Sequence, residues 1–119
     1  MILLMGYQRC STCQKAKRFL EMNNVQFKTR DIVAEKLTEE ELRKLYEMSN
    51  VSLQSFWNTS GGVYRQMRIK DTIHSMSEDE QIKLLASNGM LVKRPILMVN
   101  DQVTVGFKEA TYLDMIRQA

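Results

Sequence analysis

The sequence predicts an α/β domain in which a helical insertion separates the two halves of a mixed sheet. Three observations predict this class. An apolar strand, a helix and a second strand open the chain, a mostly helical stretch follows, and a β-hairpin with a final helix closes it. At 119 residues, with 44% hydrophobic and 26% charged residues, the chain has the size and composition of one globular domain.

The first half is predicted to be a strand–helix–strand unit. Residues 2–5 form a continuous apolar run, which is typical of a strand buried on both faces. Residues 11–22 place apolar side chains on one helical face, and the helix ends at 23–24, two asparagines that tolerate the left-handed conformation. Residues 25–29 alternate apolar and polar side chains, which predicts a second strand.

Two capping boxes mark helices in the middle of the chain. Thr38 with Glu41, and Ser77 with Glu80, have the spacing in which a hydroxyl caps the first turn and the glutamate bonds back. An Asn-Gly pair at 88–89 predicts the end of the second of these helices. The less regular sequence between the two helices predicts short helices and loops.

A hairpin and a helix are predicted to end the chain. Residues 96–99 and 102–106 are short strands around a two-residue Asn-Asp turn, a spacing typical of a β-hairpin. Residues 107–119 then have helical periodicity. A βαβ unit followed by a hairpin and a helix describes an α/β sheet of the thioredoxin type.

We expect a single domain over residues 1–119, with a thioredoxin-like core at about 1–33 and 90–119 and a helical insertion at about 34–89. No apolar run approaches the roughly 18 residues of a membrane span, and the apolar start is too short for a signal peptide. The net charge of +3 is small and dispersed. We therefore expect a cytoplasmic protein that binds neither nucleic acid directly nor a membrane.

Both cysteines of the chain lie at the predicted start of the first helix, as Cys10-x-x-Cys13. The thiolate is the reactive form of cysteine, and the free N–H groups and positive end of a helix favour an anion at Cys10. Ser11 and Thr12 add hydroxyls beside it, and Arg9 adds positive charge. Cys13, one turn later on the apolar face, should be shielded. We predict that Cys10 attacks a substrate and Cys13 resolves the intermediate.

Two other interpretations of the cysteine pair are weighed against this one. The first is a pair of inert core cysteines. The second is a metal site, but structural zinc needs four ligands, and the chain has two cysteines and a single histidine, His74. In a reducing compartment, cysteines this close together favour redox or metal chemistry over a structural disulfide. We expect no metal.

Arg94 is the candidate for a second contact to an anionic substrate, because a guanidinium matches the geometry of an oxyanion. Pro95, the single proline, follows it directly and precedes a predicted strand. X-Pro bonds are the ones that readily become cis, and a cis bond here would bring Arg94 toward the cysteine turn. The alternative is an ordinary surface arginine. The predicted substrate-binding residues are thus Ser11, Thr12, Arg94 and Pro95.

Four segments carry a family resemblance: residues 10–17 (CSTCQKAK), 56–61 (FWNTSG), 88–96 (NGMLVKRPI) and 105–108 (VGFK). Over essentially its whole length the chain resembles the family that joins the glutaredoxin-type arsenate reductases (ArsC) and the Spx/MgsR transcriptional regulators. Within that family it is most similar to uncharacterised ArsC-related proteins. The resemblance implies a thioredoxin-like, glutaredoxin-type fold with inserted helices, a cis bond before Pro95 and a nucleophile at Cys10.

The resemblance also implies a function. It implies a thiol–disulfide oxidoreductase without a bound cofactor, in which Cys10 attacks an oxyanion or a disulfide and glutathione, glutaredoxin or thioredoxin restores the dithiol. Arsenate reductases of this type look to hold arsenate with three arginines. Arg94 matches the one before the cis-proline, whereas Asn58 and Phe107 stand near the positions of the other two.

The alternative function is a redox-sensing regulator similar to Spx, which would bind RNA polymerase through the C-terminal domain of its α-subunit. Such regulators keep a Cys-x-x-Cys as a switch. They look to carry an arginine where this chain has Ser60, and a glycine near Ser52. A catalytically idle family member kept for an interaction is a third possibility.

Overall fold

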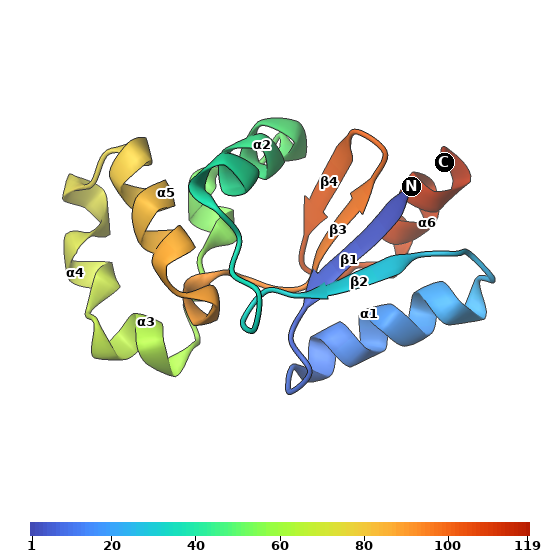
Figure 1. Cartoon of the computed structure of the whole chain (residues 1–119), viewed down its shortest axis with the longest axis horizontal. Coiled ribbons are helices and arrows are strands. Elements are labelled where there is room, and N and C mark those ends of the chain that lie inside the picture. The colour runs from blue at the N-terminus through green and yellow to red at the C-terminus, as the bar shows by residue number, and fades with distance from the viewer.

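The computed structural model describes residues 1–119 and contains a four-stranded mixed sheet with helices against both faces (Figure 1). The strands are β1 (Ile2–Gly6), β2 (Lys28–Asp31), β3 (Ile96–Val99) and β4 (Gln102–Val105), in the spatial order β2-β1-β3-β4. β1 is parallel to β2 and antiparallel to β3, and β3 is antiparallel to β4. The sheet is therefore mixed, as the sequence predicts.

Six α-helices accompany the sheet. They are α1 (Ser11–Met22), α2 (Glu39–Ser49), α3 (Gly62–Gln66), α4 (Ile69–Thr72), α5 (Glu78–Ser87) and α6 (Glu109–Arg117), with 3-10 turns at Leu53–Phe56, Ile73–Ser75 and Gly89–Leu91. Both predicted capping boxes are confirmed, at the starts of α2 and α5. No helix is long and apolar enough to pass through a bilayer.

Successive side chains of the central strands point into two different cores, because strand residues alternate between faces. Leu4 and Leu97 belong to the cluster with Leu20 of α1 and Tyr112 of α6. Met5, the next residue of β1, belongs to the larger cluster on the opposite face. This alternation is what lets α1 and α6 cover one face of the sheet while α2 packs against the other.

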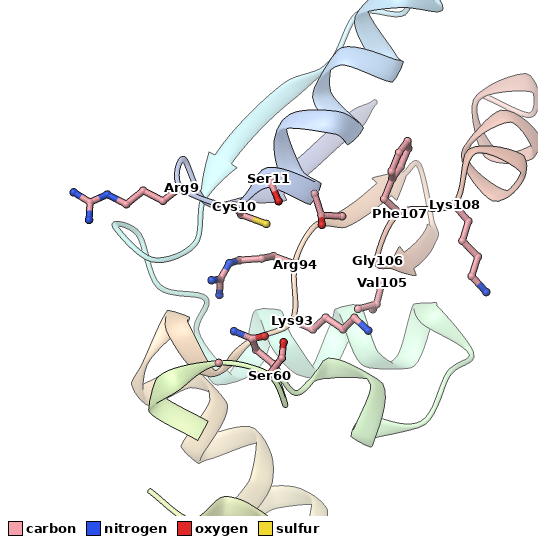
Figure 2. Close-up of a pocket in the computed structure, with 13 residues that line it drawn as sticks. Arg9, Cys10, Ser11, Ser60, Lys93, Arg94, Val105, Gly106, Phe107 and Lys108 are labelled. Carbon is pink, nitrogen blue, oxygen red and sulfur yellow. The ribbon is translucent and has the colours of Figure 1, made fainter. Parts of the chain in front are cut away.

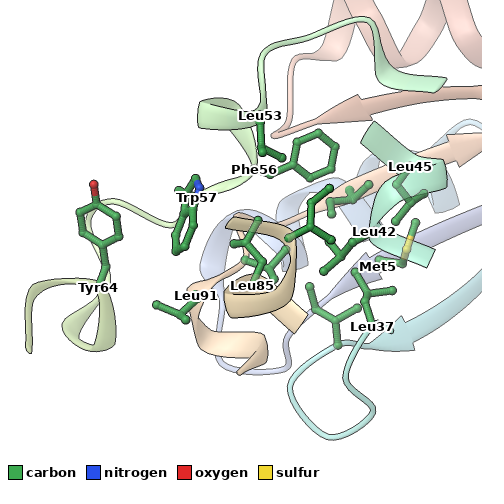
Figure 3. Packing of buried hydrophobic residues seen from close by; sticks show 14 of the residues in the cluster. Met5, Leu37, Leu42, Leu45, Leu53, Phe56, Trp57, Tyr64, Leu85 and Leu91 are labelled. Carbon is green, nitrogen blue, oxygen red and sulfur yellow. The ribbon is translucent and has the colours of Figure 1, made fainter. Parts of the chain in front are cut away.

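The larger cluster joins the sheet to the helices between β2 and β3 (Figure 3). It combines Met5 and Ile96 of the sheet with Phe56, Trp57 and Leu85 of the intervening segment, all of them almost fully buried. The Trp57 indole N–H is satisfied by the Gln81 side-chain oxygen at 3.1 Å. The helices therefore share a core with the sheet rather than forming one of their own.

Two element boundaries differ from prediction. The second strand covers Lys28–Asp31 and not 25–29, because pairing to β1 begins only at Lys28, while Val25 and Phe27 pack as a loop against the α1/α6 cluster. The last helix begins at Glu109 and not at Phe107. Phe107 instead packs edge-on against the Tyr112 ring, with ring centroids 4.9 Å apart.

Gly89 has a different role from the one predicted. The Asn-Gly pair does not end α5 in a left-handed conformation; Asn88 is extended, with φ −156°, and its side chain accepts from the Met90 N–H at 2.9 Å to start a 3-10 turn. Gly89 is required by packing, because a Cβ there would overlap the carbonyl oxygen of Ile32. The insertion thus touches the backbone that follows β2.

Candidate active site

The N-terminus of α1 holds Cys10. Cys10 is the N-cap residue, with extended backbone, and its Sγ accepts a hydrogen bond from the Cys13 backbone N–H at 3.3 Å. The first turn of α1 contains no acidic residue, so nothing there opposes the positive end of the helix. Cys10 is half-buried and both cysteines are free thiols. A half-exposed sulfur in this position is placed to act as a nucleophile.

Cys13 lies beneath Cys10, on the buried face of the same turn. Only 5% of it is exposed, and it packs so closely on β1 that a Cβ added to Gly6 would lie 3.0 Å from the Cys13 Sγ. The pKa of the Cys13 thiol is raised to about 12, mainly by burial and then by the hydrogen bond with Cys10, while the Tyr7 backbone and the charge of Arg94 partly oppose the rise. Cys13 is therefore a neutral thiol at physiological pH.

Tyr112 of α6 is a buried residue close enough to Cys13 to feel its charge. Its pKa is raised by burial and then by the charge of a Cys13 thiolate, and its hydroxyl donates to the Gly106 carbonyl at 2.9 Å. The two thiols of the site differ in exposure and in surroundings.

Arg94 borders the same site from the loop before β3. The Arg94–Pro95 peptide bond is cis, as the resemblance implies. The Arg94 guanidinium carbon lies 5.1 Å from the centre of the Tyr7 ring, and one terminal nitrogen donates to the Val92 carbonyl at a long 3.4 Å. Its Nε is buried and has no hydrogen-bond partner. Because this atom has almost no exposed surface, an anion beside Cys10 would meet the positive charge of the guanidinium rather than Nε itself.

A cavity of about 640 Å³ opens at these residues (Figure 2). In Figure 2 the Arg94 side chain lies between Cys10 and Ser60, with Lys93 and Lys108 on the side of the hairpin. The residues lining the cavity are Arg9, Cys10, Ser11, Thr12, Asn58, Ser60, Gly61, Lys93, Arg94, Val105, Gly106, Phe107 and Lys108. Four of them are cationic and none is acidic, so the cavity favours an anionic ligand.

The structure brings Cys10, Ser11, Thr12 and Arg94 to one cavity. Cys13 and Pro95 do not line it: Pro95 is buried beside it, and Cys13 lines a separate cavity of about 180 Å³. Sequence reasoning missed Lys93 and Lys108. Each is adjacent to a residue already singled out, but only the fold shows that both line the cavity with Cys10.

Asn58 forms part of the opposite wall. Its side-chain nitrogen donates to the Met90 carbonyl at 3.2 Å, and its backbone N–H donates to the Leu91 carbonyl at 2.8 Å. A Cβ on Gly61 would lie 2.6 Å from the Asn58 side-chain nitrogen, which explains the glycine three residues later. The Asn58 side chain thus holds its loop against the segment that leads to Arg94. Because Asn58 is neutral, it adds no positive charge to this wall of the cavity.

A mixed β2-β1-β3-β4 sheet, a Cys-x-x-Cys at the first helix N-terminus and a cis-proline before β3 define a thioredoxin-like fold of the glutaredoxin type. The protein belongs to the ArsC family, whose model matches residues 5–115.

Three similarities illustrate this membership. A solved structure of a putative ArsC family related protein from Bacteroides fragilis is 42% identical, with a TM-score of 0.92 over 96% of each chain. The uncharacterized protein YusI of Bacillus subtilis is 48% identical over 103 residues, which is 87% of each chain. The global transcriptional regulator Spx of Streptococcus mutans is 28% identical over 109 residues, covering 92% of this chain and 78% of Spx.

Proposed function

We propose that the protein is a cytoplasmic thiol–disulfide oxidoreductase in which Cys10 is the nucleophile and Cys13 the resolving thiol. The observation that carries the proposal is the asymmetry of the two thiols. Cys10 caps a helix at the edge of a cationic cavity, whereas Cys13 is buried one turn later with a raised pKa. Such a pair favours attack by one sulfur and internal displacement by the other.

The chemistry runs in two displacements. The Cys10 thiolate attacks one sulfur of a substrate disulfide, forming a mixed disulfide and releasing the first substrate thiolate. Cys13 then gives up its proton to solvent, attacks the Cys10 sulfur and releases the second substrate thiolate. The substrate gains two electrons and the protein becomes a Cys10–Cys13 disulfide, which an external dithiol such as thioredoxin or glutaredoxin, or glutathione, reduces again.

The second displacement becomes easier once the first has happened. In the mixed disulfide Cys10 carries no charge and no longer takes part in the thiol hydrogen bond, so two of the causes that raise the pKa of Cys13 disappear. Burial still raises it. Cys13 therefore stays protonated in the resting protein and is activated when Cys10 has reacted.

Between the two substrate kinds that the family resemblance implies, the site favours a disulfide over arsenate. Arg94 is the one arginine beside Cys10 that matches the expected arsenate clamp, and Asn58 and Phe107 supply no charge. The Arg94 guanidinium still offers its positive charge at the cavity to an anionic group of the substrate. Arg94 is thus proposed to orient a charged disulfide substrate.

The test uses hydroxyethyl disulfide, a small neutral substrate, with reduced protein and intact-mass analysis. Wild type is expected to end as a Cys10–Cys13 disulfide, which is two hydrogen atoms lighter than the dithiol by simple stoichiometry. Cys13→Ser should stop at a stable adduct on Cys10. Cys10→Ser should consume at least about 100-fold less disulfide, because the remaining thiol is buried and neutral. A Cys10→Ser variant as fast as wild type would end the proposal.

A second candidate function is supported by the similarity to the regulator Spx over 92% of this chain. In this case the Cys10/Cys13 pair would be a switch, and the partner would be the C-terminal domain of the RNA polymerase α-subunit. A pull-down of that domain with the reduced and the oxidised protein tests it. Binding that depends on redox state supports the regulator, and no binding in either state removes it.

A further inference from the structure

A second cavity lies next to the one beside Cys10. It has a volume of about 470 Å³ and is lined by residues of α1, the start of α6 and Phe107. Phe107 is the residue that lines both cavities. Its ring packs edge-on against Phe19, with centroids 5.6 Å apart, so the shared residue presents a fixed aromatic surface. Together the two neighbouring cavities make a surface that we call the α1 groove.

The charge of the α1 groove is strongly one-sided. Six of the 17 Lys and Arg residues of the chain line it, against one of the 14 Asp and Glu residues, Glu109. The six cations are Arg9, Lys15, Arg18, Lys93, Arg94 and Lys108. None of the six forms a salt bridge, although other basic residues such as Arg30 and Arg43 do. The field of the groove is therefore available to an anionic partner.

The α1 groove is also larger than a small oxyanion needs, and its lining includes apolar side chains. A five-atom oxyanion occupies roughly 150 Å³ at about 30 Å³ for each water-sized group, a small part of the 640 Å³ beside Cys10 alone. Beyond Phe107 the groove ends at Met22, a large apolar side chain that is 78% exposed. Cations together with the apolar side chains of Phe19, Phe107 and Met22 match an extended chain that carries both acidic and apolar side chains.

We infer that the substrate is an acidic polypeptide segment containing an oxidised cysteine, which lies along the α1 groove with its disulfide at Cys10. The inference rests on the proposed function and names its substrate class. An acidic residue next to the substrate cysteine contacts Arg94 and Lys93, further acidic residues contact Lys15 and Arg18, and an apolar side chain packs on Phe107. The electron balance is that of the two displacements above, with the external dithiol as the final reductant.

The test measures exchange between the reduced protein and three ten-residue peptides, each with one cysteine blocked as a mixed disulfide with 2-mercaptoethanol. The peptides have the same leucine and differ in flanking glutamates, glutamines or lysines. We expect the acidic peptide to react at least tenfold faster than the neutral one at low ionic strength, and the lysine peptide to react more slowly than both. The acidic advantage should shrink steeply in about 0.5 M salt, because screening shortens the reach of the cations.

Charge-reversal variants locate the effect. Lys15→Glu with Arg18→Glu should lower the ratio of acidic to neutral rates at least fivefold. The control is Lys70→Glu with Lys83→Glu, which gives the same change in net charge at exposed positions of α4 and α5, at the opposite end of the molecule from α1 (Figure 1). The control should keep the wild-type ratio. An equal drop of the rate ratio in both variants would show an effect of net charge alone. It would overturn the inference that the acidic peptide binds in the α1 groove.

Two further experiments distinguish the polypeptide from other possible ligands of the α1 groove. The first uses a short acidic disulfide of two or three residues. If it reacts as fast as the ten-residue peptide, binding is restricted to the cavity beside Cys10, and the inference of a polypeptide substrate is overturned. An acidic peptide with serine in place of cysteine should shift the amide resonances of residues 15–22 and 107–109. An oligouridine that shifts the same resonances at lower concentration would replace the peptide by RNA.

Failure of the proposed function gives a different pattern. A protein that does not consume neutral hydroxyethyl disulfide is no oxidoreductase, and then the substrate assignment falls with it even where the serine peptide binds. A protein that consumes hydroxyethyl disulfide but exchanges with all three peptides at equal rates keeps the proposed function and loses the acidic substrate.

Discussion

At the scale of single residues, the two thiols of the site differ mainly through burial. Cys13 is almost fully enclosed by β1 and α1, and its pKa is raised to about 12 in the folded protein, whereas an unfolded cysteine loses its proton near pH 8.5. Between those two values the unfolded chain binds fewer protons than the folded one. The free energy of unfolding should therefore fall as pH rises through this window, by up to about 1.4 kcal/mol per pH unit.

The direction of this pH dependence of the free energy of unfolding gives the first prediction. Cys13→Ala should be less stable than wild type at pH 7, because it loses a packed sulfur, yet its stability should decline less steeply above about pH 8.5. Urea unfolding at a series of pH values measures both slopes. The matched control is Cys10→Ala, which leaves the buried thiol in place and should keep most of the alkaline decline. Parallel pH profiles for Cys13→Ala and wild type would contradict the burial argument.

Gly89 and Gly62 provide a second prediction at this scale. A Cβ at Gly89 would overlap the Ile32 carbonyl oxygen, which is backbone and cannot rotate away, whereas a Cβ at Gly62 meets nothing within 4 Å. Gly89→Ala should lower the free energy of unfolding by at least about 2 kcal/mol. Gly62→Ala, in a helical position, should be neutral or stabilising by up to about 1 kcal/mol. Equal effects in denaturant unfolding would show that the packing at Gly89 does not decide its identity.

At the scale of elements, Arg30 and Glu41 fix the start of α2 to β2. The guanidinium makes two hydrogen bonds to the Glu41 carboxylate, at 2.6 and 3.2 Å, and one to the Lys36 carbonyl at 2.9 Å. The same carboxylate accepts from the Thr38 N–H at 2.9 Å. Arg30 lowers the pKa of Glu41, and the Thr38 backbone lowers it further. The capping box of α2 is thus tied to the sheet.

The third prediction concerns Glu41→Gln. Because the folded pKa of Glu41 is depressed, its stabilising contribution is present above the unfolded value near 4.3 and is lost as pH falls through the folded value. We expect a loss of about 1 kcal/mol at pH 7, modest because the carboxylate is 41% exposed, and a smaller loss near pH 3. Thermal unfolding at the two pH values measures it. Glu47→Gln, at an exposed position of the same helix, is the control.

Elements with strong local signals were predictable, and those set by distant contacts were not. Some features are specified by sequence signals that lie within four residues of one another. These are the capping boxes at Thr38 and Ser77 and the hairpin turn at 100–101. The start of β2 depends on which residues find a partner on β1, and the start of α6 depends on Phe107 packing against aromatic rings from α1 and α6. Neither contact produces a recognisable pattern in the local sequence.

The same distinction applies to the site. Cys10 with Ser11 and Thr12, and Arg94 before the single proline, stand out in the sequence and lie together in the fold. Lys108 and Ser60 belong to the segments 105–108 and 56–61, but neither was predicted to be a site residue, and only the fold shows that both line the cavity with Cys10. The groove beyond Phe107 was not predictable, because it needs the relative placement of α1 and α6.

At the scale of the whole molecule, the sheet and the inserted helices share one core. The larger cluster contains Met5 and Val103 of the sheet together with Trp57, Tyr64 and Ile69. A backbone pairing between the Trp57 segment and Val92 continues this link to the loop before β3. The two regions should therefore unfold together rather than as separate units.

This gives the fourth prediction. Trp57 fluorescence reports on the inserted helices, and hydrogen exchange at the amides of β1 and β3 reports on the sheet. Both should give the same free energy of unfolding, and Leu85→Ala, which empties a buried position of the shared core, should lower both by about 2–4 kcal/mol. Lys83→Ala, exposed on the same helix, is the control. A drop seen by Trp57 alone would mean that the insertion unfolds independently.

The order of the strands has one more consequence, for contacts between copies of the molecule. β2 and β4 are the two edges of the sheet, and an edge strand offers unpaired backbone groups to any other chain. β2 is composed of Lys28, Thr29, Arg30 and Asp31, and charged side chains on an edge strand disfavour the addition of another strand. β4 contains no charged residue. Aggregation through strand addition is thus guarded against at β2, and β4 is the edge at which charged substitutions would improve solubility.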